Sequence, residues 1–195
     1  MKYLSDKEIL NFFSAVKKGK NPRRDLCLFG LMLSYGMRLN EVLSIRLEDL
    51  SLDPLDPQIF VRRLKRRKPY GRWHELSKEN FQRIKSWLKE RKNWRGARSE
   101  YLFLSQKSRG RYDHLGRDCL WNLVKRYGKA AGIEDIYPHK FRYTAGVRMA
   151  REGLNAFTIQ RRLGHADVKS TQGYVDLFGP ESREEDRKCA EAIEF

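Results

Sequence analysis

The sequence lacks the features that place a protein in a membrane or in an oxidising compartment. No apolar run approaches the roughly 20 residues that a membrane-spanning helix requires, and the first residues do not show the pattern of a secretory signal peptide. The three cysteines, Cys27, Cys119 and Cys189, lie far apart, which fits neither a disulfide framework nor a paired-cysteine zinc site. We therefore expect a cytoplasmic protein with reduced thiols.

Acidic residues are scarce relative to basic ones. The 195 residues include 41 lysines and arginines against 25 aspartates and glutamates, which gives a formal net charge of +16. Between Arg62 and Arg72, seven of eleven residues are basic and none is acidic, whereas residues 181–195 carry six acidic and three basic side chains. A body this basic is attracted to polyanions, so that nucleic acid is the leading partner and a membrane surface the second. A solvated surface is the alternative explanation of the basic run.

The pattern of apolar residues predicts a mainly helical α+β fold. Hydrophobic residues make up 40% of the chain, enough for one sizeable core, and no internal repeat or low-complexity linker divides the sequence. The stretches "QIFVRRL" and "RWHEL" predict a small antiparallel β-hairpin with a Pro-Tyr-Gly turn and the basic run at its tip. Capping residues and helical spacing predict helices at about residues 5–17, 21–36, 39–47, 77–88 and 120–127, and short helices from about His139 onward.

Two stretches carry arginine or histidine in settings that surface charge explains poorly. In "YGMRLNEVL", Arg38 follows a helix stop among apolar neighbours, and a buried guanidinium requires a partner. Glu41 is positioned to pair with it across one helical turn, either as an ordinary ion pair or to hold Arg38 toward a phosphate. In "YPHKFRYTAGVRMA", the i, i+3 spacing places His139 and Arg142 on one face of a helix that begins after Pro138. Alone, this pair is typical of a helix surface.

A third stretch, "RRLGHADVKSTQGYVD", contains His165 and, nine positions later, Tyr174. Alone, a histidine after glycine is typical of a turn, and a tyrosine in an amphipathic helix is typical of a core. Together, the three stretches follow one another as in the tyrosine recombinases, or phage integrase family, which the chain resembles from about Leu4 to about Phe178. "YGMRLNEVLSIRLEDL" resembles the first-arginine box, "PHKFRYTAGVRMA" the His-x-x-Arg box and "LGHADVKSTQGYV" the Gly-His to tyrosine box.

This resemblance implies an enzyme that cuts and rejoins DNA strands through a covalent 3′-phosphotyrosyl intermediate. Tyr174 would attack phosphorus, and Arg38 and Arg142 would bind the nonbridging oxygens of the same phosphate. A phosphodiester repels nucleophiles, and a phenol with a pKa of about 10 is a weak one at neutral pH, so that cations must stabilise the developing charge. His139 and His165 would add hydrogen-bond donors and manage protons.

The family also places a general-acid lysine on a β-hairpin between the first two boxes. We predict Lys65, with Lys68 as the alternative, because "RWHEL" replaces the usual Val-Pro-Leu ending and leaves the hairpin length open. The implied chemistry needs no cofactor and no metal, and no carboxylate cluster of the metal-ligand type stands out. We expect the residues of the basic run to bind the phosphates of double-stranded DNA: Arg62, Arg63, Arg66, Arg67, Lys68 and Arg72.

Two departures from the family pattern qualify the resemblance. Only about three residues precede the first predicted helix, as in the short members that invert fimbrial promoter switches or in an excised catalytic domain. Tyr143 stands where the family usually has a histidine, beside Arg142, and is therefore a competing nucleophile. We expect residues 1–180 to form the catalytic domain of a protein that is monomeric in solution and tetrameric on paired DNA sites. Residues 181–195 would form an acidic segment that is either packed on its own domain or exchanged between protomers.

The alternatives to a site-specific recombinase are two. A type IB topoisomerase shares the phosphotyrosyl chemistry but relaxes supercoils without a partner site. A DNA-binding regulator that has lost cleavage would need only the basic surface. The presence of Arg38, His139, Arg142, His165 and Tyr174 together favours an active enzyme, whose task would be integration, excision or inversion.

Overall fold

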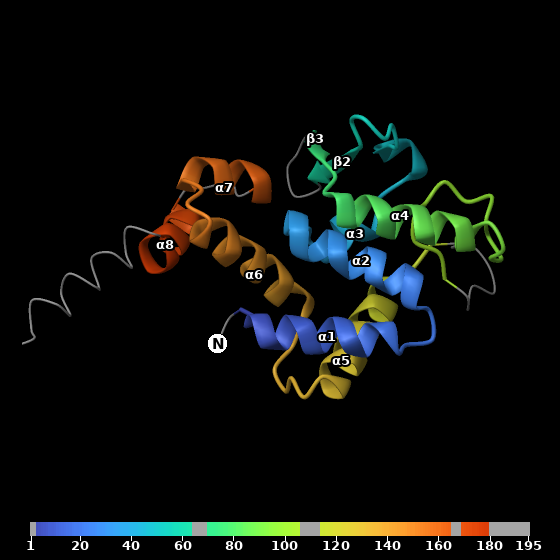
Figure 1. Ribbon diagram of the computed structural model, residues 1–195, viewed down its shortest axis with the longest axis horizontal. Helices are drawn as coiled ribbons and strands as arrows, with labels where there is room; N and C mark the ends of the chain where they lie inside the picture. Colours follow the sequence, from blue (N-terminus) through green and yellow to red (C-terminus); the bar gives the residue numbers. More distant parts are fainter. Residues whose placement is uncertain (1–2, 64–69, 106–113, 165–168, 180–195) are drawn as a thin grey trace, which may run out of the picture.

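The computed structural model describes residues 3–63, 70–105, 114–164 and 169–179. Among these, α1, α2, α4 and α5 gather into one group, whereas α6 leads to α7 and α8 at the other end of the molecule (Figure 1). The elements in chain order are α1 (Asp6–Lys17), α2 (Pro22–Tyr35), α3 (Leu39–Leu43), a 3-10 helix (Leu47–Asp49), β1 (Leu50–Ser51), β2 (Gln58–Arg63), β3 (Tyr70–Glu75), α4 (Lys78–Arg91), α5 (Arg117–Ala130), α6 (Pro138–Arg151), α7 (Ala156–Leu163) and α8 (Lys169–Phe178). The predicted fold class, mainly helical with a small antiparallel sheet, is confirmed.

Local sequence signals explain where the first two helices begin and end. At the start of α1, the Ser5 hydroxyl accepts a hydrogen bond from the Glu8 backbone N–H at 3.2 Å, and the Glu8 carboxylate accepts one from the Ser5 N–H at 2.7 Å. Helix α2 starts at Pro22 and ends where Gly36 adopts a left-handed conformation with φ of 56°. The side chain of Asn21 makes no capping hydrogen bond, so the start of α2 depends on the proline rather than on the predicted cap.

The sheet has the predicted hairpin with one strand more than expected. Strands β2 and β3 pair antiparallel, and the two-residue β1 adds to the outer edge of β2. Tyr70 and Gly71 belong to β3 and not to a turn. A Cβ atom on Gly71 would lie 2.2 Å from the Phe60 ring, so that this glycine leaves room for a cross-strand aromatic. The tip of the hairpin, residues 64–69, lies outside the described residues.

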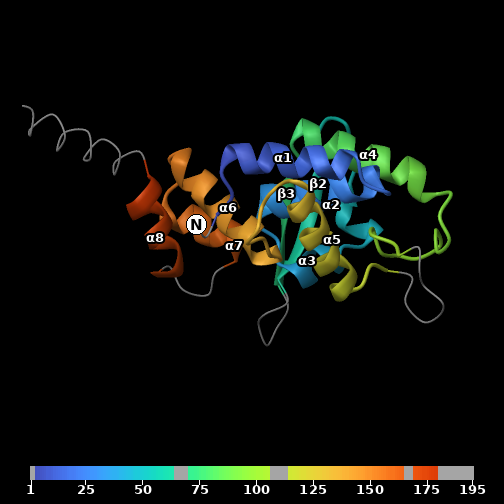
Figure 2. The same ribbon diagram turned by 90° about the horizontal axis from the view of Figure 1, so that it is seen from below.

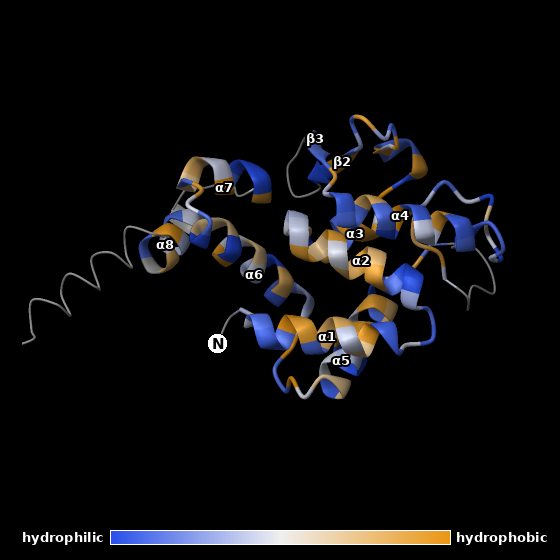
Figure 3. Ribbon diagram, viewed as in Figure 1, coloured by the Kyte–Doolittle hydropathy of each residue, from blue (hydrophilic) through white to orange (hydrophobic). Residues whose placement is uncertain are grey.

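The core consists of two apolar clusters. In the larger one, Phe12, Phe29 and Phe141 pack ring against ring, with centroids 4.9 Å apart for the first pair and 5.5 Å apart for the second. Helix α2 runs through this cluster, and Figure 3 shows apolar residues along its middle and a hydrophilic turn at its N-terminal end. The smaller cluster joins α6, α7 and α8 and includes Tyr174. None of the helices in the described residues is both long and apolar enough to span a membrane.

Candidate active site

Arg142 is buried at the junction of the two clusters. Its side chain is on α6, its residue is 1% exposed, and its Nη1 donates to the carbonyl oxygen of Gly36 at 2.7 Å. Within the described part of the chain, its Nε and Nη2 have no hydrogen-bond partner. Burial, together with the nearby charge of Arg38, lowers the pKa of Arg142 to about 9. Buried donors without acceptors are costly, and an anion that accepted hydrogen bonds from both nitrogens would remove that cost.

Arg38 is held beside it by Glu41. Arg38 caps the N-terminus of α3, and its Nη1 and backbone N–H donate to the two Glu41 carboxylate oxygens at 2.7 and 2.9 Å. Its Nη2 donates to the carbonyl oxygen of Gly164 at 3.4 Å. The Arg38 side chain keeps 23% of its surface exposed, whereas that of Glu41 keeps 1%. The expected pair is therefore present, and it leaves Arg38 accessible from solvent.

Two glycines that end helices bring the arginines together. Gly36 ends α2 and Gly164 ends α7, both in the left-handed conformation, with φ of 56° and 66°. A Cβ atom on Gly36 would lie 2.2 Å from a methyl group of Leu163, because the ends of these two helices approach closely. Each glycine carbonyl accepts a hydrogen bond from one arginine, Gly36 from Arg142 and Gly164 from Arg38.

Tyr174 lies in the smaller cluster, near Arg142. The residue is 7% exposed, and its ring packs edge-on against Tyr143 with centroids 4.8 Å apart. Gly146 on α6 provides space for the ring, since a Cβ atom there would lie 2.9 Å from it. Burial chiefly, and Tyr143 secondarily, raise the pKa of Tyr174, while the charge of Arg142 opposes the shift. The phenol is therefore protonated at neutral pH, and an attack by its oxygen requires cationic assistance.

His139 and Arg142 occupy the same helix in different environments. His139 is exposed in the first turn of α6, whereas Arg142, three residues later, is buried. Tyr143, the other tyrosine beside Arg142, is half-buried. The helix therefore places one hydrogen-bonding group toward solvent and one cation toward the interior.

The hairpin arginines differ from the expected row of DNA-facing cations. Arg62 pairs with Asp49 at 2.6 Å and Glu48 at 2.9 Å, and these carboxylates raise its pKa. Arg63 is 4% exposed and pairs with Glu41 at 2.7 Å, so that it lies in the interior and its placement on a DNA-facing surface is wrong. Arg72 is exposed. The other predicted residues lie outside the described residues: Lys65, Arg66, Arg67, Lys68 and His165.

The inward position of Arg63 has a sequence signal that the charge pattern obscured. Alternate residues of a strand share a face, and Ile59, Val61 and Arg63 are all buried. The contributions of Gly36, Gly164 and Gly146 have no such signal, because they depend on helices that are distant in the sequence. In the described part of the chain, no three histidine, cysteine or carboxylate side chains are grouped as metal ligands.

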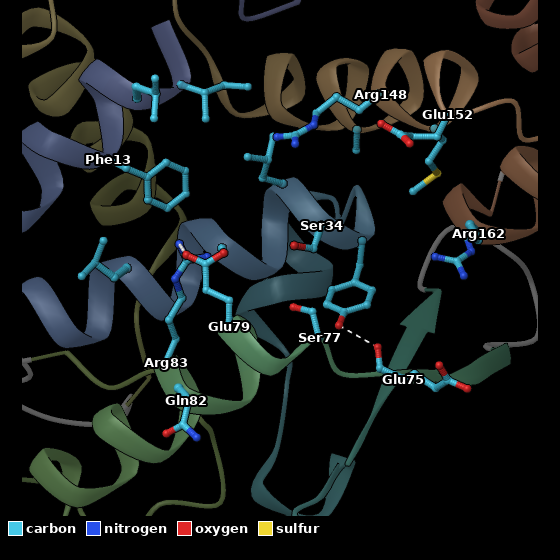
Figure 4. A pocket seen from close by; sticks show the side chains of 18 of the residues that line it. Phe13, Ser34, Glu75, Ser77, Glu79, Gln82, Arg83, Arg148, Glu152 and Arg162 are labelled. Carbon is cyan, nitrogen blue, oxygen red and sulfur yellow. Dashed lines mark hydrogen bonds and ion pairs between the residues drawn. The ribbon is translucent and has the colours of Figure 1, made fainter. Parts of the chain in front are cut away.

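The groove shown in Figure 4 does not include the arginine site. That groove, about 890 Å³ in volume, is lined by side chains of α1, α2, α4 and α6, among them Phe13, Arg83 and Arg148. Its lining includes none of Arg38, Arg142 and Tyr174. Figure 2 shows α3 and the ends of β2 and β3 that lead to residues 64–69 on the side opposite α1 and α4. Helix α3, whose N-cap residue is Arg38, therefore lies on the side away from α1 and α4.

Known proteins resemble the chain in sequence. Residues 2–179 match the Phage integrase family. The chain is 31% identical over 176 residues to the type 1 fimbriae regulatory protein FimE of Escherichia coli K12, a match that covers 89% of this chain and 85% of FimE. It is 33% identical over 172 residues to the tyrosine recombinase XerA of Pyrococcus horikoshii. This match covers 87% of this chain and 57% of XerA.

Solved structures share the fold. A crystal structure of XerA recombinase aligns with a TM-score of 0.75 at 26% identity, over 99% of this chain and 66% of that one. The catalytic domain of bacteriophage HP1 integrase aligns with a TM-score of 0.62 at 22% identity, over 95% of this chain and 93% of that domain. A pre-cleavage complex of XerH recombinase with its difH substrate aligns with a TM-score of 0.74 at 23% identity, but this chain spans only 50% of XerH.

Proposed function

We propose that this chain, which belongs to the phage integrase family, is a site-specific DNA recombinase that cuts and rejoins strands through Tyr174. The observation that carries the proposal is the buried guanidinium of Arg142, with two donors unoccupied among the described residues, next to Arg38 and Tyr174. Two cations beside a phenol are the arrangement that attack on a phosphodiester requires. FimE and XerA, relatives with about 30% identity, are named a fimbriae regulatory protein and a tyrosine recombinase.

In the proposed reaction, one bond to phosphorus replaces another. The oxygen of Tyr174 attacks the scissile phosphate and loses its proton, the P–O5′ bond breaks, and a 3′-phosphotyrosyl enzyme and a 5′-hydroxyl result. Arg38 and Arg142 stabilise the charge on the nonbridging oxygens, since planar guanidinium donors suit phosphate geometry. A phosphodiester is present before and after, so that the reverse attack by a 5′-hydroxyl rejoins a strand without a cofactor.

Proton transfer completes the proposed mechanism. The leaving 5′-oxygen takes a proton from Lys65, or from Lys68 if the hairpin register differs. His139 and His165 contribute donors to the phosphate and manage protons, with a neutral imidazole of the pair accepting the proton that Tyr174 loses. Outside the reacting phosphate, Arg72, Arg66, Arg67 and Lys68 bind the phosphates of double-stranded DNA. Arg62 joins them only by exchanging its carboxylate partners for phosphate.

We further propose that the protein is monomeric in solution and assembles into a tetramer on paired DNA sites. In that tetramer, residues 181–195 would be exchanged between protomers. The acidic composition of this segment contrasts with the basic body and supports an intermolecular contact. Residues 1–180 would be the catalytic domain. We place the protein in the cytoplasm, at the bacterial nucleoid, where its DNA substrate lies.

The test is a nicked duplex that traps the covalent intermediate, for which the target sites of the fimbrial relatives and the DNA flanking the gene are the first substrates. Wild-type protein should form a denaturation-resistant adduct, Tyr174→Phe should form none, and Tyr143→Phe should still form it. An adduct that persists in Tyr174→Phe and disappears in Tyr143→Phe would assign the nucleophile to Tyr143.

The same preparations separate the alternative functions. Relaxation of supercoiled plasmids of arbitrary sequence by the monomer would favour a type IB topoisomerase. Tight, sequence-specific binding with no adduct on any nicked substrate, unaffected by Tyr174→Phe, would favour a regulator that has lost cleavage.

A further inference from the structure

Arg63 is the third arginine described at the site; it is buried, and its guanidinium donates hydrogen bonds to protein groups. It is the last residue of β2, and its Nη1 donates to Glu41 Oε2 at 2.7 Å. Its Nη2 donates to the carbonyl oxygen of Arg162, in the last turn of α7. Its side chain also packs on Gly164, where a Cβ atom would lie 2.9 Å from Arg63 Cδ. Arg63 therefore joins β2, α3 and the end of α7.

Glu41 divides its carboxylate between two arginines. Oε1 accepts from Nη1 of Arg38, whereas Oε2 accepts from the backbone N–H of Arg38 and from Nη1 of Arg63. A carboxylate that is free on both oxygens binds a guanidinium in two-point fashion. With Oε2 occupied by Arg63 and by the Arg38 backbone N–H, Arg38 contributes only one guanidinium nitrogen to Glu41, and its Nη2 turns toward Gly164.

We propose that Arg63 is a positioning residue for strand cleavage, which acts by competing with Arg38 for Glu41. This inference rests on the function proposed above. Arg63 keeps the Arg38 guanidinium from closing onto the carboxylate, so that donors of Arg38 remain available to the scissile phosphate. Through the Arg162 carbonyl, it also fixes the end of α7 against the same carboxylate. Arg63 makes no contact with DNA in this role.

Charge balance at the site supports the assignment. Arg38, Arg63 and Arg142 surround one buried carboxylate, and the charges of both Arg38 and Arg63 lower the pKa of Arg142. The cluster therefore keeps an excess of positive charge that an anionic phosphate offsets. Removing Arg63 lowers that excess, and it also lets Arg38 neutralise Glu41 in a two-point pair, so that the cleavage step loses more than one charge.

The experiment separates cleavage from binding in Arg63→Met and Arg63→Lys. With saturating nicked duplex, Arg63→Met should form the Tyr174 adduct roughly tenfold to a hundredfold more slowly per folded molecule, a loss below or near that for deleting one transition-state donor. Its affinity for intact duplex should change by less than about threefold, since Arg63 itself contacts no phosphate and the other phosphate contacts of the duplex remain. Arg63→Lys should be intermediate, because an ammonium holds Glu41 but does not span to the Arg162 carbonyl.

A double variant gives the readout that a merely structural role would not. In Arg63→Met with Glu41→Gln, the neutral amide no longer retains Arg38, so that cleavage should be faster than in Arg63→Met alone. Arg91→Met is the matched control for loss of stability, because Arg91 is buried away from the site and should cleave at the wild-type rate per folded molecule.

The contrary results are distinct. Any of three results would overturn the role of Arg63 alone. Arg63→Met could cleave as fast as wild type, it could lose only affinity for DNA, or the double variant could cleave more slowly than Arg63→Met. Wild-type protein that forms no adduct on any nicked duplex would overturn the proposed function and this inference with it.

Discussion

Two buried arginines, Arg91 and Arg142, show how differently one side chain is used in the two halves of the molecule. The residues are 4% and 1% exposed, and burial is the main reason that the pKa of each is lowered. Arg142 has one hydrogen bond, to the Gly36 carbonyl, and two nitrogens without partners among the described residues. Arg91, at the end of α4, instead donates from all three nitrogens to four backbone carbonyls: those of Ala97, Ser99, Tyr101 and Leu102.

The comparison distinguishes an arginine whose donors are satisfied within the fold from one that keeps two nitrogens for the phosphate we propose. The donors of Arg91 satisfy carbonyl groups of the segment that follows α4, which has little regular structure of its own. The free-energy cost of burying the Arg142 guanidinium is not offset by an equivalent set of hydrogen bonds. Natural sequences tolerate such an arrangement at functional sites. The number of satisfied donors, rather than burial or charge, separates the two roles.

Replacement of Arg142 should have the largest effect, and that effect should be a loss of activity without a loss of stability. We expect Arg142→Gln to slow adduct formation by about 10³-fold or more, because the transition state loses donors from a charged group. The melting temperature should stay within about 3 °C of wild type, since the substitution removes a poorly compensated buried charge. Single-turnover cleavage and a thermal melt measure both. Lys89→Gln, an exposed cation lost from α4, is the control and should change neither.

Removing Arg91 should give the reverse result. Arg91→Met removes the guanidinium donor from three part-buried carbonyl oxygens, those of Ala97, Ser99 and Tyr101, while the Leu102 carbonyl keeps the Trp87 donor. With the loss of the buried side chain's other contacts, we expect the free energy of unfolding to fall by about 3 kcal/mol. Cleavage per folded molecule should remain that of wild type. Urea unfolding, with the folded fraction taken from the same curve, checks this expectation. Equal unfolding midpoints for Arg91→Met and wild type would contradict the assignment of Arg91 as structural.

Two glycine substitutions extend the comparison to Tyr174, the proposed nucleophile, and should have the smallest effect. Gly146→Ala places a methyl group against the Tyr174 ring, and we expect the ring to shift and adduct formation to slow by about tenfold, as for other small displacements of reacting groups. Gly173→Ala is the matched control, because a Cβ atom there would meet nothing within 4 Å.

Stability should separate the two variants as well. Gly173→Ala should raise the free energy of unfolding by about 0.5–1 kcal/mol through helix propensity alone. In Gly146→Ala the contact with Tyr174 should cancel most of that gain. Thermal melts of both variants measure the difference, and equal stabilisation together with equal cleavage rates would show that the Tyr174 ring has room at Gly146.

Much of the fold follows from local sequence signals, whereas the geometry of the site follows from distant contacts. The Ser5 and Glu8 capping box and the proline and glycine that bound α2 are properties of a few adjacent residues, and their predictions are confirmed. Tyr70 and Gly71 have the composition of a turn, but pairing with β2 overrides that preference. Strand β1, with two residues, is too short to have a periodic pattern.

The site residues divide in the same way. The pairing of Arg38 with Glu41 is local, and the i, i+3 spacing in the sequence is enough to predict it. The interior position of Arg63 is not evident from a run of basic residues, because charge alone suggests solvent; its partner Glu41 is 22 residues away. The burial of Arg142 depends on Gly36, 106 residues earlier, and no local pattern reports it.

The two left-handed glycines have an electrical consequence. Gly36 and Gly164 terminate helices, and the C-terminal end of a helix carries about half a negative elementary charge. Arg142 and, in part, Arg38 are thus restrained by peptide dipoles, whose fractional charge orients a guanidinium without cancelling it. At Arg142 a carboxylate in place of the Gly36 carbonyl would have cancelled most of the positive charge, whereas the helix end leaves it in place. Arg38, by contrast, is partly neutralised by Glu41, so that the two arginines present different positive charges to an anion.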